Sequence, residues 1–183
     1  MATSRGAAIG ANSPPASPII VCTGAEDVRE VYERTVPERR QDLVFLQNGI
    51  VLTMLPPGAP SVTSAVIYFS VLERGGPARG GGCTFVHGRF APFLTELLRA
   101  GGVECMEVPR LHIIEALAAE KLLWASCMWM VCHAHEGINV GQVHDTPSSQ
   151  QTLRELVAEL LPIAARSLSL ADGEGDTHTH THT

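Results

Sequence analysis

The chain has 183 residues, of which 45% are hydrophobic and 17% are charged. This composition is typical of a globular protein with one domain, or with one domain and part of another. The formal net charge is -6, and Arg39-Arg40 is the only adjacent basic pair. Nucleic acid and anionic membranes are therefore not expected as partners, because both require clustered Lys and Arg.

Residues 1–17 consist mainly of Ala, Ser, Gly and Pro, with one arginine and no acid. We expect a disordered N-terminal segment. It has no apolar core of the kind found in signal peptides. Its composition is weakly similar to that of a transit peptide. A plastid or another organelle is therefore the alternative to a cytoplasmic location.

A βαβ unit is predicted over residues 18–46. A short apolar strand after Pro18 ends at Thr23-Gly24, and residues 25–35 follow with apolar side chains at helical spacing and two acids in the first turn. The apolar run from Leu43 to Leu46 forms the second strand. Both strands are nearly continuous in hydrophobic residues, which indicates a parallel sheet covered on both faces.

The second strand ends abruptly in Gln47-Asn48-Gly49. In open α/β sheets, ligands bind outside the carboxyl ends of the strands. Asn48 is therefore expected where a cofactor or substrate is met. Asn-Gly is also a common turn dipeptide, and the residues alone leave both interpretations open.

After a proline-rich break at residues 56–60, the pattern predicts further strands and one helix. The strands are expected at residues 62–72, 83–87 and 103–108, and the helix at residues 90–100. The glycine-rich residues 74–82 match neither G-x-G-x-x-G nor G-x-x-x-x-G-K-[ST]. A flexible hairpin connection is therefore favoured over a phosphate-binding loop.

From Pro109 onward the pattern becomes helical. One long helix is predicted over residues 110–135 and another over residues 148–168, joined by residues 137–147. The fold class is thus α/β followed by all-α. We expect a partial Rossmann-like domain at 18–108, a helical domain fragment at 109–170 and a disordered Thr/His tail at 171–183.

Neither a metal site nor a membrane span is predicted. The chain has five cysteines and no C-x-x-C pair, in an apolar context that favours buried, reduced thiols over disulfides: Cys22, Cys83, Cys105, Cys127 and Cys132. His133 and His135 flank the last of these, but no acid or second cysteine stands at a usual ligand spacing. The longest apolar stretch, Leu122–Cys132, is too short to cross a bilayer.

Lys121 and Glu120 are the only charged residues between Ala116 and Cys132. The residues three and four positions away from Lys121 are all apolar, so its face of the helix is apolar. A charge in such surroundings needs solvent, a partner or a ligand. A lysine that extends its ammonium to the surface and a lysine that meets a ligand are both consistent with the residues.

The order of these motifs resembles that of the ketopantoate reductase family, and of related chains described as 6-phosphogluconate-dehydrogenase-like. A strand followed by Thr-Gly and a helix leads to Leu-Gln-Asn-Gly, and a long helix later carries Glu-Lys-Leu-Leu-Trp at residues 120–124. The resemblance covers roughly residues 18–168. It implies a Rossmann-like domain that binds NADP and a helical domain that closes over a keto acid substrate.

The resemblance also implies roles for particular residues. Asn48 is expected at the nicotinamide and substrate cleft, with Thr23, Gln47 and Gly49 as further cofactor-binding residues. Lys121 matches the lysine that polarises the keto group and supplies a proton as hydride arrives. Oriented donors of this kind stabilise a developing alkoxide strongly in a dry site.

Three departures from the family pattern change what is expected. No G-x-G-x-x-G precedes Pro18, Gly24 stands near the position of a family lysine, and Ala125 stands where the family has an asparagine. Without the glycine turn, the pyrophosphate loses its backbone N–H donors and its helix N-terminus. We therefore expect weak or absent NADPH binding by the chain as given.

Two interpretations follow. The chain is either an NADP-dependent reductase by ancestry, truncated or represented by a fragmentary gene model, or a non-catalytic module that associates with another chain. A Rossmann-like half without its first strands leaves the strand at residues 19–22 as an apolar edge, which can pair with another chain. Self-association or binding to a partner chain is therefore expected.

Overall fold

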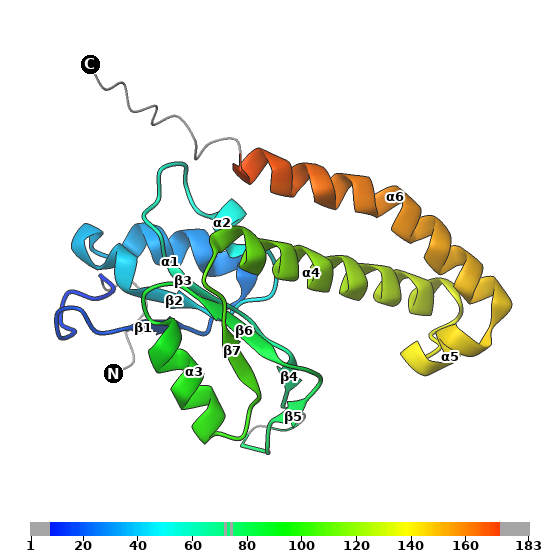
Figure 1. Cartoon of the computed structure of the whole chain (residues 1–183), viewed down its shortest axis with the longest axis horizontal. Coiled ribbons are helices and arrows are strands. Elements are labelled where there is room, and N and C mark those ends of the chain that lie inside the picture. Colours follow the sequence, from blue (N-terminus) through cyan, green and yellow to red (C-terminus); the bar gives the residue numbers. More distant parts are fainter. Residues whose placement is uncertain (1–7, 72, 74, 173–183) are drawn as a thin grey trace. The chain divides into compact units, whose positions relative to one another are not determined.

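The structure is a computed structural model that describes residues 8–71, 73 and 75–172, without the side chains of residues 167–172. The disorder predicted for residues 1–7 and 173–183 lies outside these ranges. The chain divides into two compact units, residues 1–114 and 115–183, so that the division falls inside one long helix. The first unit is α/β and the second is helical, as the sequence predicts (Figure 1).

A five-stranded sheet with the order β1-β2-β3-β6-β7 forms the centre of the first unit. Its strands are β1 (Ile19–Val21), β2 (Leu43–Phe45), β3 (Thr63–Val66), β6 (Thr84–His87) and β7 (Cys105–Glu107). All neighbouring strands are parallel except β3 and β6, which are antiparallel. The predicted parallel-leaning sheet is confirmed, and β1 stands at one of its edges.

Helices cover both faces of this sheet. In β2, Leu43 and Phe45 pack into one cluster with residues of α1 (Val28–Arg34) and α2 (Val51–Met54). Val44 points to the other face and packs with residues of α3 (Ala91–Ala100). Because successive side chains of a strand alternate between faces, a continuous apolar run is what a strand buried on both sides requires.

The strand predicted over residues 62–72 is divided into two. The sheet strand β3 ends at Val66, and β4 (Phe69–Ser70) pairs instead with β5 (Arg79–Gly80) in a separate two-stranded ribbon. At the break, the Tyr68 N–H donates to the side-chain Oγ1 of Thr84 at 3.1 Å. The glycine-rich segment thus forms part of a hairpin, as predicted, and Leu72 lies outside the described residues.

The second unit contains most of α4 (Leu111–Ala134), the short α5 (Val140–Asp145) and α6 (Pro147–Asp172). A ring nitrogen of His135 lies 3.0 Å from Thr152 Oγ1 and links the end of α4 to the start of α6. The segment that joins these two long helices contains α5, whose start is a capping box between Asn139 and Gln142. Within the described ranges, no helix is long and apolar enough to cross a bilayer.

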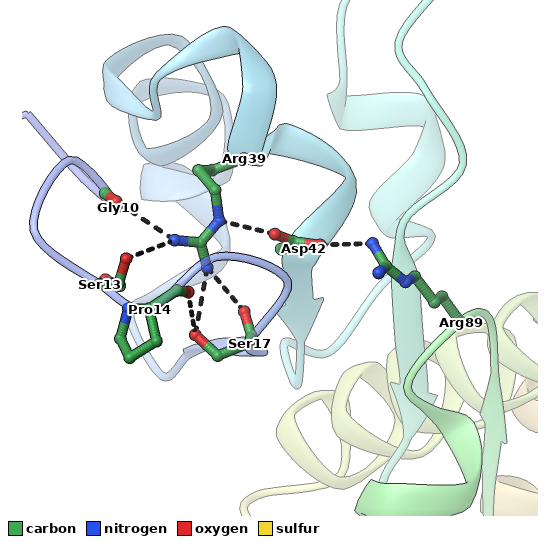
Figure 2. A network of polar contacts seen from close by, with 7 residues as sticks. All are labelled: Gly10, Ser13, Pro14, Ser17, Arg39, Asp42 and Arg89. Carbon is green, nitrogen blue, oxygen red and sulfur yellow. Dashed lines mark hydrogen bonds and ion pairs between the residues drawn. The ribbon is translucent and has the colours of Figure 1, made fainter.

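A buried ionic network precedes β2 (Figure 2). Asp42, at the end of the 3-10 turn η2 (Pro37–Asp42), is 1% exposed. Its Oδ2 accepts from Arg39 Nε at 2.6 Å, and its Oδ1 accepts from Arg89 Nη1 at 2.8 Å. Arg89 comes from the turn between β6 and α3, so one carboxylate links distant parts of the first unit.

The Arg39 guanidinium also holds the N-terminal segment. It donates to the carbonyl oxygens of Gly10, Ser13 and Ser17 at 3.3, 3.1 and 2.7 Å, and the contacts appear in Figure 2. Ile9 forms a parallel bridge with Thr35. Composition predicts disorder for residues 1–17, whereas residues 8–17 are fixed here because a buried guanidinium needs acceptors for its five N–H groups.

We predict that Asp42→Ala lowers the free energy of unfolding by about 3–5 kcal/mol, because Arg39 then remains buried without its counter-charge. Urea denaturation followed by circular dichroism measures the loss. Glu33→Ala is the matched control, because Glu33 pairs with Arg29 at 3.1 Å on an exposed helix surface. That variant is expected to lose less than about 1 kcal/mol. Equal losses in the two variants would contradict a structural role for the network.

Candidate functional site

The predicted cofactor-binding residues lie just beyond the last residue pair of strands β1 and β2. The two strands are parallel, and their final pair is Val21 with Phe45. Their carboxyl ends therefore meet at the same edge of the sheet. Thr23 is two residues beyond one end and Gln47 two residues beyond the other, so the parallel register places these two residues opposite each other.

Gln47 joins the two strand ends through its side chain. Its Nε2 donates to the Val21 carbonyl oxygen at 3.0 Å and to the Thr23 carbonyl oxygen at 3.2 Å. The side chain amide thus continues the β1–β2 ladder after the backbones have stopped pairing. Gln47 is 8% exposed, and its Oε1 is buried without a hydrogen-bond partner among the described residues.

Asn48 and Gly49 form the turn that follows. Asn48 is exposed, at the position beyond the β2 carboxyl end that the sequence predicts. Gly49 has a φ of 105°, a conformation that side chains rarely adopt, and an added Cβ would approach Met54 Cε within 2.9 Å. Glycine is therefore required for the sharp turn that places Asn48 at the surface beside Gln47.

The turn after β1 is also exposed. Thr23 Oγ1 donates only to the neighbouring Gly24 carbonyl oxygen, at 3.3 Å. At Gly24, near the position where the resemblance places a lysine, an added Cβ would meet the carboxylate of Glu26. An acid therefore lies next to the position where the family carries a cation, and this is unfavourable for an anionic group bound at that turn.

Lys121 belongs to the second unit, on α4, and is the only lysine of the chain. It is half-buried, and burial lowers its pKa below the ordinary value of 10.5. The residues one helical turn away on either side are uncharged. Thr23, Gln47, Asn48 and Gly49 are thus brought together within the first unit, and Lys121 is positioned by the second.

Gln47 is among the residues predicted from the sequence, but the role of its side chain is not. The predicted parallel pairing of the two strands offers a signal for this role. Gln47 and Thr23 each stand two residues beyond the final pair, Phe45 and Val21, so they are expected opposite each other. Among the residues that the structure describes, no group of three or more His, Cys, Asp or Glu side chains could hold a metal ion.

We predict that Gln47→Glu lowers the free energy of unfolding by roughly 3 kcal/mol near neutral pH, because a carboxylate cannot donate to two carbonyl oxygens. Burial and these carbonyls raise the pKa of the new carboxyl above its unfolded value of about 4.3. Its protonated form restores one donor, so stability is retained below the unfolded pKa and lost as pH rises through the folded pKa.

Urea denaturation at about pH 7 and about pH 4.5 measures this dependence. Gln41→Glu is the matched control, because Gln41 is exposed on the turn before β2. Its carboxyl is expected to change stability little at either pH. A Gln47→Glu variant whose deficit relative to the natural chain is the same at both values would contradict the buried donor role.

Comparisons with known proteins give structural similarity without sequence similarity. No protein-family model matches the chain. No curated protein matches it either. The fold is nevertheless similar to several solved structures, and the similarity extends over most of this chain.

The structure of a dimeric ketopantoate reductase from Staphylococcus aureus matches with a TM-score of 0.56 and 16% identity, over 89% of this chain and 59% of that one. D-mandelate dehydrogenase in complex with NADH matches with a TM-score of 0.48 and 15% identity, over 89% of this chain and 60% of that one. The chain therefore spans about three-fifths of the length of either structure. Over that span it has the fold of ketopantoate reductase, a Rossmann-like α/β region followed by long helices.

Proposed function

We propose that this chain is an NADP-dependent oxidoreductase of the ketopantoate reductase type, which reduces the keto group of a keto acid. One observation carries the proposal: in a chain whose fold is similar to that of a ketopantoate reductase, strand β2 ends at Phe45 and leads into the turn of Gln47, Asn48 and Gly49. Ligands of open α/β sheets bind at this end of the strands. The buried Oε1 of Gln47 has no partner among the described residues, and it fits a ligand that carries a hydrogen-bond donor.

The reaction assigns different tasks to the residues. Reduced nicotinamide, when bound, would supply the hydride that the keto carbon takes up. Asn48 donates its amide N–H to the substrate, while Thr23 and Gln47 hold the nicotinamide end. Lys121 polarises the keto oxygen and transfers a proton to it, which gives the hydroxy acid and a neutral amine that solvent reprotonates. Burial lowers the pKa of Lys121, which makes its ammonium a better acid near neutral pH.

The pyrophosphate of the coenzyme lacks its usual anchor. No G-x-G-x-x-G occurs in the sequence, and the acid next to Gly24 opposes an anionic group at the turn after β1. Such an anchor normally supplies backbone N–H donors at a helix N-terminus. We therefore expect NADPH to bind in the millimolar rather than the micromolar range.

We predict slow oxidation of NADPH by the purified chain when millimolar NADPH and a 2-keto acid are both present, measured by the loss of absorbance of the reduced coenzyme. Lys121→Met is expected to lower the rate by about 100-fold or more, the usual loss when a general acid is removed. His112→Gln, an exposed change on the same helix, serves as the control. Micromolar affinity for NADPH would show that another segment replaces the glycine turn.

The pH dependence follows from the state of Lys121. The proton donor must be charged, so the rate falls as pH rises through its pKa, which burial places below 10.5. Reductive methylation with a carbon-13 label gives one lysine resonance, because the chain has a single lysine. Its titration by NMR measures the pKa independently of turnover. An ordinary lysine pKa, or no oxidation of NADPH with any 2-keto acid, would count against the proposed chemistry.

A second candidate function is that of a non-catalytic module that self-associates. The exposed apolar residues of the helical unit favour it: Trp129 is 76% exposed, and the exposed Leu122 lies seven residues before it on the same face of α4. Further along, Leu161 and Ile163 of α6 are also exposed. Large apolar patches rarely stay bare on monomeric proteins.

We predict that the chain sediments as a dimer or larger species at tens of micromolar, and that Trp129→Gln shifts it toward the monomer because the largest exposed apolar side chain is removed. Phe93→Gln on α3 in the first unit is the matched control, and it tests whether any exposed aromatic has the same effect. Analytical ultracentrifugation provides the measurement. A compact monomer of the natural chain at these concentrations would contradict self-association.

A further inference from the structure

The two edge strands of the five-stranded sheet, β1 and β7, differ in how their outer sides are protected. At the β7 edge, Arg99 Nε donates to the Cys105 carbonyl oxygen at 2.9 Å, and the acids Glu104 and Glu107 flank that residue closely. Native proteins use charged side chains in this way to prevent an edge strand from pairing with another chain. Among the described residues, no charged side chain bonds to the backbone of β1.

The outward backbone groups of β1 are open within the described part of the chain. On the side of β2, the Gln47 amide donates to the carbonyl oxygens of Val21 and Thr23. Alternate residues of a strand direct their N–H and C=O groups to opposite edges, so Ile20 and Cys22 direct theirs away from β2. No described residue forms a hydrogen bond with these outward groups. The strand therefore presents a template for one more strand.

The segment at residues 8–17 lies beside β1 without pairing with it. An added Cβ at Gly10 would come within 3.1 Å of Ile19 Cδ1, which places this segment against the Ile19 side chain. Ile20 points to the other face of the sheet and is 40% exposed. Within the described ranges, both the outer edge of β1 and the Ile20 side chain are accessible.

We propose that β1 pairs antiparallel with β1 of a second copy of this chain, with the two Ile20 residues opposite each other. Ile20 is the middle residue of the strand, so this register pairs the whole of β1. The two Ile20 residues exchange both N–H···O bonds, and each Cys22 N–H donates to the Pro18 carbonyl oxygen of the other copy. Because proline has no N–H, every outward donor of β1 then has an acceptor.

A second copy fits this edge better than another occupant. No charged residue stands between Arg5 and Glu26, so an identical segment can approach without bringing like charges together. The two exposed Ile20 side chains meet on one face of the joined sheet and cover each other. Residues 1–7 of the same chain offer a single β-branched residue, Thr3, and a glycine, which is a poor composition for a strand.

This pairing goes beyond the proposed function, because it requires neither coenzyme nor Lys121. It also uses a surface of the first unit, whereas the exposed face with Trp129 belongs to the second. Main-chain hydrogen bonds provide the affinity when a strand is added to a sheet edge. Since so short a strand buries little area, the pairing is expected to be weak and dependent on concentration.

Thiol cross-linking tests the register. In a full-length chain with Cys22→Ser, the change Ile20→Cys places two thiols on opposite residues, whose Cα atoms lie about 5.5 Å apart. A short bismaleimide is expected to join the two copies several-fold more efficiently than in Met106→Cys with the same Cys22→Ser change. Met106 is the matched control, because it is the middle residue of β7 and is 49% exposed. Equal cross-linking at the two positions would overturn the pairing.

The change Ile20→Pro tests the hydrogen bonds. Because the Ile20 N–H points away from β2, proline removes a donor to the second copy and none within the chain. In a Trp129→Gln chain, Ile20→Pro is expected to abolish the self-association that remains, whereas Ile20→Val keeps the N–H and serves as the control. Analytical ultracentrifugation measures the mass, and circular dichroism checks the fold.

Each outcome decides the matter. Equal association of the proline and valine variants, both folded, would overturn the pairing, and so would a natural chain that is monomeric at tens of micromolar. Loss of association in the folded proline variant alone would support it. Where the proline variant fails to fold, the cross-linking ratio between Ile20→Cys and Met106→Cys decides instead.

Discussion

Strand β2 is held at both of its ends by side chains, and the arrangement of the first unit depends on this constraint. Before the strand, the buried Asp42 carboxylate joins the guanidiniums of Arg39 and Arg89. After it, the Gln47 amide joins the turns that follow β1 and β2. A strand of three residues has few ladder hydrogen bonds of its own. Polar anchors at its two ends therefore fix its direction and, with it, the place where the strand-end turns meet.

The two ends of β2 have different physical requirements. At the amino end, a buried charge must be neutralised and every donor satisfied, which explains why the Arg39 guanidinium also holds the segment at residues 8–17. At the carboxyl end, the buried Gln47 Oε1 has no donor among the described residues, and the neighbouring turn residues Thr23 and Asn48 are neutral. The first end is suited to stability and the second to recognition. This division agrees with the general location of ligands in open α/β sheets.

The two candidate functions use the apolar helix α4 differently. A reductase uses the helix to present Lys121 in surroundings that lower its pKa. A self-associating module uses the exposed face that contains Trp129. The two uses do not exclude each other. Lys121 and Trp129 are eight residues apart, and a helix repeats every 3.6 residues. Their side chains therefore point in directions that differ by about 80°. Association through one face therefore leaves the lysine side of the helix to chemistry.

The sequence by itself determined the helices α1, α3, α4 and α6, the central strands and the position of Asn48 after β2, because hydrophobic periodicity and turn residues are local signals. The capping box at Asn139 was equally local and could have predicted α5. Only the tertiary structure decided that the strand predicted over residues 62–72 divides at Tyr68, and that Arg39, Asp42 and Gln47 are buried anchors. These outcomes depend on partners far away in the chain, such as Thr84 for Tyr68 and Val21 for Gln47. Burying a polar side chain is unfavourable unless it has a hydrogen-bond partner. When that partner is distant in the chain, no local sequence pattern predicts the pair.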